Sequence, residues 1–338
     1  MIEIYLEKLQ NKENLSQEEV EEVMHDIMSG VMSHHDMASF LIKLKEKGPT
    51  IEEITGAAKI MRRFVVGIKT KHKHVLDTCG TGGDKTHTFN ISTVTALVVA
   101  GAGVAVAKHG NRSVSSRCGS ADVLEALGVN LNLDESDLTR CLDEIGIAFL
   151  FAQKLHPAMK NIAAVRQELK TETIFNILGP LTNPANATHQ MVGVYSRDLV
   201  EPIAHVLKNL GLKRVLVVHG NDGLDEITTT DKTFIAEYNG REILSYHIDP
   251  EELKIKRARL EDLRGGDLKT NVKIIEDILD GKTGRKRDIV VLNAAYALYV
   301  AQKVGSISDG LNMAEESIDT GAAKKKLDEL RTLTSSHQ

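Results

Sequence analysis

The stretch Asp77-Thr78-Cys79-Gly80-Thr81-Gly82-Gly83-Asp84 is a glycine-rich loop that directly follows the apolar pair Val75-Leu76. Its clustered glycines let the backbone adopt positive φ and bring N–H groups close to a ligand. Asn90-Ile91-Ser92-Thr93 and the apolar run 94–100 come next and predict the start of a buried helix. Such a loop favours phosphate binding, because backbone donors and the helix dipole both attract an anion. A simple turn of the chain is the alternative.

A second polar loop strengthens the phosphate interpretation. It reads Lys108-His109-Gly110-Asn111-Arg112-Ser113-Val114-Ser115-Ser116-Arg117 and follows the strand-like residues 104–107. Gly119-Ser120-Ala121-Asp122 ends it before another predicted helix. Two donor-rich loops at the ends of successive strands would form a two-walled anion site.

From residue 75 onward, short β-rich runs alternate with helical stretches. This alternation predicts an α/β fold with a mainly parallel central sheet and flanking helices. Ligands are then expected at the carboxyl ends of the strands, where both polar loops lie. The predicted strands are 75–76, 104–107, 147–151, 190–194, 215–219, 233–238 and 289–292.

The first part of the chain has only helical patterns. Ser16 with Glu19, Ser33 with Asp36 and Thr50 with Glu53 each predict a helix start. We therefore expect a smaller all-helical domain at 1–70. A helix that begins at Pro157 and runs to 169 is expected to rejoin it, so that about 156–185 belongs to this domain. Residues 71–155 and 186–338 would form the α/β domain.

Composition narrows the function classes. The net charge is −5 and 42% of residues are hydrophobic, which favours a full core and argues against bulk binding to nucleic acid or membranes. The three cysteines are too few and too scattered for a disulfide framework or a cysteine-rich metal site. Residues 1–3 begin an acidic amphipathic helix rather than a signal peptide. We expect a soluble, cytoplasmic protein.

Several further positions have side chains suited to ligands. Asp225-Glu226 follows a predicted strand, and adjacent carboxylates suit Mg²⁺, with an exposed acidic turn as the alternative. Ser92 could add a hydroxyl ligand or serve only as a helix cap. Arg166 could clamp a carboxylate or be a solvated helix residue. His109 and His156 are candidates for lining a pocket, although a lone histidine is more often structural.

Several common chemistries are excluded by the motifs that are missing from the sequence. No Gly-Lys-Ser/Thr follows a glycine loop, and no G-x-S-x-G elbow is present. The first loop reads Gly-Thr-Gly-Gly-Asp rather than G-x-G-x-x-G, so dinucleotide binding is disfavoured. No histidine-rich or cysteine-rich spacing supports a zinc site.

Taken together and in order, these motifs resemble those of the anthranilate phosphoribosyltransferases. The likeness covers nearly the whole chain and adds the stretch 156–166, Asn176-Ile177-Leu178-Gly179-Pro180-Leu181-Thr182-Asn183-Pro184 and Gly223-Leu224-Asp225-Glu226. It implies a fold shared with pyrimidine nucleoside phosphorylases and a homodimer joined through the helical domain. It also implies transfer of phosphoribose from phosphoribosyl pyrophosphate (PRPP) to the amine of anthranilate in tryptophan biosynthesis.

The same resemblance assigns residues to ligands. Anthranilate would contact Gly80, Asn111 and Arg166, and Mg²⁺ would be held by Ser92, Asp225 and Glu226. The residues implied for PRPP are Gly80, Gly83, Asp84, Thr88, Asn90, Ile91, Ser92, Thr93, Lys108, His109, Gly110, Asn111, Arg112, Ser113, Val114, Ser115, Ser116 and Ser120.

The chain departs from the family pattern at two positions. Lys85 stands where glycine is usual, which would stiffen the glycine loop or add a cation beside the phosphates. Glu172 stands where arginine is usual, which puts a local ion pair near the hinge in doubt. A nucleoside phosphorylase of the same fold and a non-catalytic nucleic-acid-binding relative are the alternative functions. No acid–base residue is assigned, because the anthranilate amine is already neutral.

Overall fold

The N-terminal fifth of the chain forms a helical layer. The structure is a computed structural model and describes residues 2–84, 86–112 and 118–335. The layer contains α1 (Ile2–Gln10), α2 (Gln17–Ser29), α3 (His34–Lys47) and α4 (Ile51–Arg63). Capping boxes at Ser16 and Thr50 and a side-chain cap at Ser33 start α2, α4 and α3, so the three predicted helix starts are confirmed.

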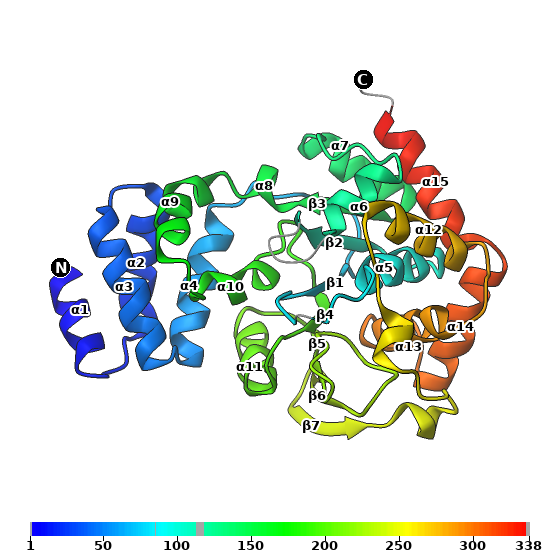
Figure 1. Ribbon diagram of the computed structural model, residues 1–338. Coiled ribbons are helices and arrows are strands. Elements are labelled where there is room, and N and C mark those ends of the chain that lie inside the picture. Colours follow the sequence, from blue (N-terminus) through cyan, green and yellow to red (C-terminus); the bar gives the residue numbers. More distant parts are fainter. Residues whose placement is uncertain (1, 85, 113–117, 336–338) are drawn as a thin grey trace.

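A seven-stranded sheet forms the centre of the molecule, in the order β3-β2-β1-β4-β5-β6-β7 (Figure 1). Its first five strands pair in parallel, and β6 and β7 extend the edge in antiparallel fashion. The predicted mainly parallel α/β fold is therefore confirmed. The strands are β1 (Leu76–Gly80), β2 (Val106–Gly110), β3 (Ile147–Phe151), β4 (His189–Gly193), β5 (Arg214–Gly220), β6 (Thr233–Tyr238) and β7 (Ile243–Ile248).

One predicted strand was wrong and one real strand was missed. Residues 289–292 lie inside the helix α13 (Arg285–Val300), where nearly every side chain is buried. An apolar run that is covered on all sides does not reveal whether its period is that of a helix or a strand. The missed strand, β7, lies at the sheet edge and is only partly buried, so its apolar signal is weak.

Helices cover both faces of the sheet. On one face, α5 (Ile91–Gly101) and α13 pack with the C-terminal helices α14 (Ile307–Asp319) and α15 (Ala322–Ser335). On the other face, α11 (Val200–Asn209) packs against β5 and against α4 of the helical layer. The remaining α-helices are α6 (Ser120–Ala126), α7 (Glu135–Arg140), α8 (Ala152–Leu155), α9 (Lys160–Leu169), α10 (Phe175–Leu178) and α12 (Leu268–Leu279).

The chain returns to the helical layer after β3. A 3₁₀ turn at Pro157–Met159 leads into α9, which packs against α2 and α3, and α10 contacts α4. The side-chain amide of Asn161 donates to the carbonyl of Met28 over 2.8 Å. Figure 1 shows α9 beside the N-terminal helices and α10 between them and the sheet.

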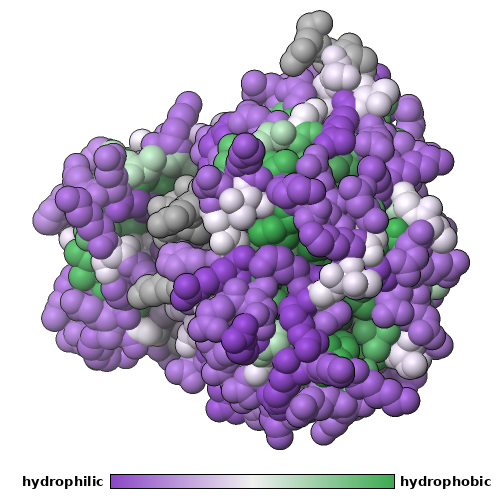
Figure 2. Space-filling view, turned by 45° about the vertical axis from the view of Figure 1, so that its right-hand side comes forward, coloured by the Kyte–Doolittle hydropathy of each residue, from purple (hydrophilic) through white to green (hydrophobic). Residues whose placement is uncertain are grey.

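Most apolar side chains lie inside this arrangement. The face shown in Figure 2 is largely hydrophilic, with only small hydrophobic areas. Among the residues that the structure describes, none of the helices combines the length and the apolar character that a membrane span would need.

Two buried histidines connect the sheet with the segment that returns to the helical layer. His109 near the end of β2 and His156 before the 3₁₀ turn place their Nε2 atoms 3.0 Å apart. Burial lowers the pKa of His109 to about 3, with repulsion by His156 as the second cause. Burial also lowers the pKa of His156 to about 4. Both rings are therefore neutral at physiological pH, and one of them donates to the other.

We expect His156→Gln to flatten the pH dependence of stability in acid. In the wild type, the unfolded chain protonates His156 below about pH 6.5, whereas the folded chain resists until about pH 4. Stability is thus fully present above pH 6.5 and is lost as the pH falls. Removing this group should reduce the loss between pH 6.5 and 5 by about 2 kcal/mol, because one proton contributes about 1.4 kcal/mol per pH unit.

Urea unfolding at several pH values measures this loss. The control is His205→Gln, since His205 is exposed and its ring meets water in both states. An unchanged pH dependence in His156→Gln would contradict the expectation.

Candidate functional site

The glycine loop after β1 faces the acidic loop after β5. Gly82 and Gly83 have φ of 65° and 82°, a conformation that residues with a side chain rarely adopt. This turn lets the N–H of Gly82 donate to Oδ2 of Asp225 over 2.8 Å. Asp84 lies near enough to raise the pKa of Asp225 by charge repulsion, and its own carboxylate accepts from the Thr86 hydroxyl.

The acidic loop approaches the ends of β1 and β4 so closely that side chains are excluded there. A Cβ at Gly193, the last residue of β4, would lie 1.5 Å from the carbonyl oxygen of Asp225. A Cβ at Gly80 would lie 2.5 Å from Oδ2 of the same residue. Gly80 is therefore required here for close packing, a demand that the sequence pattern alone does not distinguish from ligand contact.

A cation and a helix N-terminus complete the cluster. Lys108 is buried on β2, and its Nζ donates to the carbonyl of Thr78 at 2.7 Å and to Oγ of Ser92 at 3.2 Å. The Glu226 carboxylate lies close enough to the backbone N–H of Ser92, in the first turn of α5, for this donor to lower its pKa. The helix dipole favours a negative charge at this position. Ser92 thus connects Lys108 to the acidic pair.

The acidic pair is in an environment that disfavours two negative charges. Desolvation raises the pKa of Glu226 well above its usual value, and the neighbouring Asp225 raises it further. Desolvation, followed by repulsion from Asp84, raises the pKa of Asp225. Burial lowers the pKa of Lys108, and the attraction of nearby carboxylates opposes this effect. A cation bound beside the pair would relieve the repulsion and keep both carboxylates ionised.

These residues fit Mg²⁺ by their donor chemistry. Mg²⁺ usually takes one or two protein carboxylates and completes its shell with water and phosphate oxygens. Asp225 and Glu226 supply the carboxylates, and Ser92 adds a hydroxyl beside them. No cluster of three or more His, Cys, Asp or Glu suited to a metal occurs in residues 2–84, 86–112 and 118–335, so an all-protein cage is absent there.

Asp77 is a member of this cluster that the sequence reasoning missed. Its fully buried carboxylate on β1 accepts from the backbone N–H of His109 at 3.1 Å and from Nε2 of Gln190 at 3.3 Å. Burial raises the pKa of Asp77, while Lys108 is among the groups that lower it. The sequence did contain a signal for this role: Asp77 directly follows the apolar residues at the start of a predicted strand. An acid buried at such a position is rarely without a partner, so it was expected to contact other polar groups.

The loop after β2 is only partly described. A Cβ at Gly110 would lie 2.4 Å from Oγ of Ser120, and that hydroxyl donates to the carbonyl of Asn111. The Arg112 guanidinium pairs with Asp122 and Glu125 at 2.9 Å each, so it is engaged within the protein. The predicted PRPP contacts Ser113, Val114, Ser115 and Ser116 lie outside the described residues, as does Lys85.

Some polar groups at the start of α5 are hydrogen-bonded within the described part of the protein, and others are not. The amide nitrogen of Asn90 donates to the carbonyl of Cys118 at 3.1 Å. Its Oδ1 and the hydroxyl of Thr93 are buried and have no partner within the described part of the chain. The Ile91 side chain is in the core, so only its backbone could meet a ligand. Thr88 lies in the preceding loop and forms an isolated antiparallel bridge with Arg264.

Arg166 on α9 is separate from this cluster in its contacts. Its half-buried guanidinium lies over the Phe175 ring at 5.6 Å, and burial lowers its pKa. It has no hydrogen bond or ion pair to a residue in the described ranges, which leaves its donor fork open to an anion. Glu172 is exposed and likewise forms no ion pair with described residues.

A pocket in the described part of the chain lies elsewhere. It has a volume of about 420 Å³, lies between α1, α2 and α4, and is lined by Tyr5, Glu22 and Ile60 among others. None of the predicted ligand residues lines it. The backbone donors, Lys108 and the carboxylates described above meet instead at the carboxyl edge of the sheet, where ligands of parallel α/β sheets usually bind.

Comparison with known proteins agrees with this geometry. Residues 72–324 match the model of the glycosyl transferase family, a/b domain, and residues 4–65 match that of the glycosyl transferase family, helical bundle domain. Anthranilate phosphoribosyltransferase from Petrotoga mobilis is 51% identical over 334 residues, covering 99% of this chain and 97% of the relative.

Solved structures give the same result. The crystal structure of anthranilate phosphoribosyltransferase from Thermus thermophilus has a TM-score of 0.93 and 40% identity, covering 98% of this chain and 99% of that one. The Saccharomyces cerevisiae enzyme in complex with PRPP and Mg has a TM-score of 0.91 and 27% identity, covering 99% and 98%. By its two domain models and its full-length relatives, this chain belongs to the anthranilate phosphoribosyltransferase family.

Proposed function

We propose that this enzyme transfers 5-phosphoribose from PRPP to the amine of anthranilate, forming N-(5-phosphoribosyl)anthranilate and pyrophosphate in tryptophan biosynthesis. The observation that carries this proposal is the meeting of Ser92, Lys108 and the Asp225-Glu226 pair at one sheet edge. The family membership and the yeast complexes with PRPP and Mg and with 4-fluoroanthranilate support it.

PRPP would lie across the glycine loop, the start of α5 and the loop after β2. Gly83 and the helix start offer backbone N–H groups to phosphate oxygens, and Asn90 and Thr93 offer polar atoms that lack partners among described residues. Because Arg112 is held by Asp122 and Glu125, we assign it to holding the loop as well as to contacting PRPP. Residues 113–116 would complete this wall.

Mg²⁺ would be held by Asp225 and Glu226, with the Ser92 hydroxyl beside them. When bound, it would neutralise negative charge on the pyrophosphate oxygens. The chain's own contribution is to fix the carboxylates in place, through the Gly82 N–H to Asp225 and the Ser92 N–H to Glu226. Each of these bonds favours the ionised form that a cation requires.

The reaction needs stabilisation of a leaving group more than acid–base catalysis. Negative charge grows on pyrophosphate as the bond to the ribose breaks, and backbone donors with Lys108 oppose that charge. The anthranilate amine is already neutral, so it needs only correct placement against the anomeric carbon. Arg166 would hold the anthranilate carboxylate, and Asn111 and Gly80 would border the ring.

We further propose that residues 1–70 with 156–185 form a domain that moves against the α/β domain and closes over PRPP. Arg166 is on the first and Lys108 is on the second, so closure would bring the two substrates together and exclude water. The crossing at His156 is the natural hinge region. We place the enzyme in the cytoplasm, since its three cysteines are too few and too scattered for a disulfide framework.

The metal requirement gives a direct test of activity. With wild-type enzyme, anthranilate fluorescence should change only when PRPP and Mg²⁺ are both present. Asp225→Asn should lower the rate roughly 10- to 100-fold, because the amide lacks the charge that holds the cation, and added Mg²⁺ should partly restore it. Exposed Asp198→Asn is the control. Turnover without metal would disprove the assignment.

The role of Arg166 separates the two substrates. Arg166→Ala should raise KM for anthranilate roughly 10- to 100-fold, the value of a charge-assisted bond of about 1.5–3 kcal/mol, and leave KM for PRPP nearly unchanged. Arg166→Lys keeps the charge but loses the bidentate fork, so its KM for anthranilate should lie between those of the wild type and Arg166→Ala. Steady-state kinetics with each substrate varied measures this, with exposed Arg241→Ala as the control. Equal effects on both substrates would remove the assigned role.

The helical layer is the proposed dimer surface. Ile4 on α1 and Ile42 on α3 are 58% and 37% exposed, and these two helices pack side by side. Burying such residues against a second copy would be favourable. The double variant Ile4→Glu with Ile42→Glu should run as a monomer in light scattering. Leu244→Glu, which changes a 44% exposed residue on β7, should remain a dimer. A wild type that is already monomeric would refute the surface.

A further inference from the structure

A buried asparagine on α13 holds the peptide that follows the acidic pair. Asn293 is fully buried, and its Oδ1 accepts from the N–H of Ile227 at 3.0 Å. Its Nδ2 donates to the carbonyl of Ile227 at 2.8 Å and to that of Ile289 at 2.8 Å. One side-chain amide therefore engages both backbone groups of the residue next to Glu226.

This position is unusual for an asparagine. The neighbouring side chains on α13 are apolar and buried, and asparagine is a poor residue for a helix interior. Only an amide side chain carries the neutral acceptor and paired donors that this contact uses. An apolar residue would leave the Ile227 peptide buried without partners. Two of the three Asn293 hydrogen bonds therefore go to the acidic loop and one goes to its own helix.

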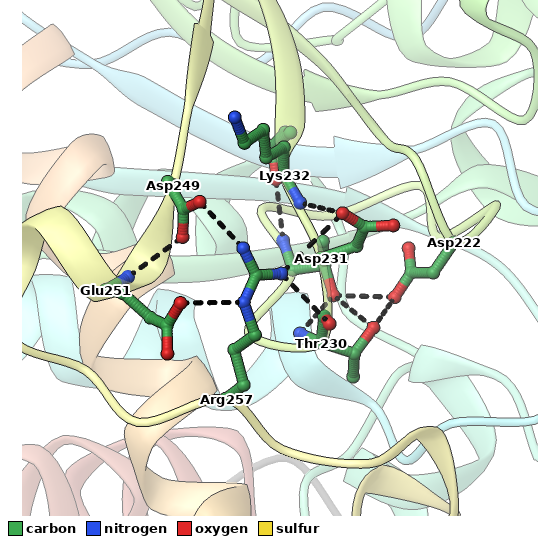
Figure 3. A network of polar contacts seen from close by, with 9 residues as sticks. Asp222, Thr230, Asp231, Lys232, Asp249, Glu251 and Arg257 are labelled. Carbon is green, nitrogen blue, oxygen red and sulfur yellow. Dashed lines mark hydrogen bonds and ion pairs between the residues drawn. The ribbon is translucent and has the colours of Figure 1, made fainter.

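The other side of the pair is held as well. Oδ1 of Asp222 accepts from the Leu224 N–H at 3.2 Å, and its Oδ2 accepts from the Thr228 hydroxyl at 2.7 Å. Figure 3 shows that Thr230 joins this network and that Arg257 ties it to Asp249 and Glu251. Leu224 and Ile227, which flank the pair, are both fully buried. The backbone on both sides of the acidic pair is thus clamped by buried contacts.

We propose that Asn293 is a positioning residue for the Mg²⁺ site: by fixing the Ile227 peptide it holds Asp225 and Glu226 together beside Ser92 and Lys108. Two carboxylates in this environment repel each other, and a free loop would relax by separating them or turning them to solvent. The clamp keeps them paired before the cation arrives. This inference rests on the proposed function for the identity of the metal, but it assigns a role to a residue outside the loop.

Binding of Mn²⁺ alone, followed by the EPR signal of the free ion, tests the inference without turnover. Asn293→Leu keeps the approximate volume and removes all three side-chain hydrogen bonds. It should weaken Mn²⁺ binding roughly 10- to 100-fold, the usual effect of losing a group that orients a metal ligand. The Mg²⁺ concentration for half-maximal activity should rise by the same factor, and KM for anthranilate at saturating Mg²⁺ should not change.

Asn271→Leu is the matched control. Asn271 is also a buried helix asparagine, and its Oδ1 accepts from the backbone N–H of Gly266, in a loop that does not carry the acidic pair. It should lower thermal stability in a similar way but leave Mn²⁺ binding unchanged. If Asn293→Leu does not fold, Asn293→Ser replaces it, because a smaller side chain puts no apolar group against the Ile227 peptide.

Wild-type Mn²⁺ affinity in a folded Asn293 variant would overturn the inference, as would an equal loss in Asn271→Leu. Failure of the proposed function would be recognised separately. In that case the wild type would not convert anthranilate with PRPP and Mg²⁺, while the difference in Mn²⁺ affinity between the Asn293 and Asn271 variants would still be measurable.

Discussion

The approach of the acidic loop to the ends of β1 and β4 is the constraint on which the rest of the site depends. Asp225 lies where a Cβ on Gly193 or on Gly80 would overlap with it, at 1.5 Å from its carbonyl and 2.5 Å from its carboxylate. Only this approach lets the Gly82 N–H reach Asp225. If the loop lay further out, Glu226 would lose the influence of the Ser92 N–H, and the proposed cation site would no longer border the proposed phosphate donors.

That geometry concentrates charge where solvent is scarce. Burial and repulsion raise the pKa of Asp225 and Glu226, burial lowers that of Lys108, and each charge is tolerated because the others oppose it. Asp77 and Asp84 add to the negative side, so within the described cluster carboxylates outnumber the lysine. The site therefore favours a dication, and a dication in turn favours a substrate rich in phosphate oxygens. The negative carboxylates attract the metal ion, and the positive metal ion attracts the phosphate oxygens of the substrate.

The features that could be predicted from the sequence are those that depend on residues close together in the chain. Capping boxes at Ser16 and Thr50 and the glycines after β1 are short-range signals, and they predicted helix starts and the loop correctly. Residues 289–292 were wrongly predicted as a strand because α13 is buried all round and has no polar face to show its period. Asp77 and Asn293 were missed because their partners, His109 and Ile227, are distant in sequence and are brought near only by the sheet and by helix packing.

Residues proposed to contact ligands are easier to recognise in the sequence than the residues that hold the ligand-binding loops in place. The side chains of loops at strand ends are not constrained by core packing, so polar motifs in these loops indicate which ligands they bind. The groups that fix those loops are buried in strands and helices, where a polar side chain is costly unless every donor and acceptor is matched. Asn293 meets that condition by hydrogen-bonding the N–H and the carbonyl of Ile227 and a carbonyl of its own helix. Because this amide is part of the core, the packing of the core fixes the conformation of the loop. The loop can therefore hold the carboxylates close together before any cation binds.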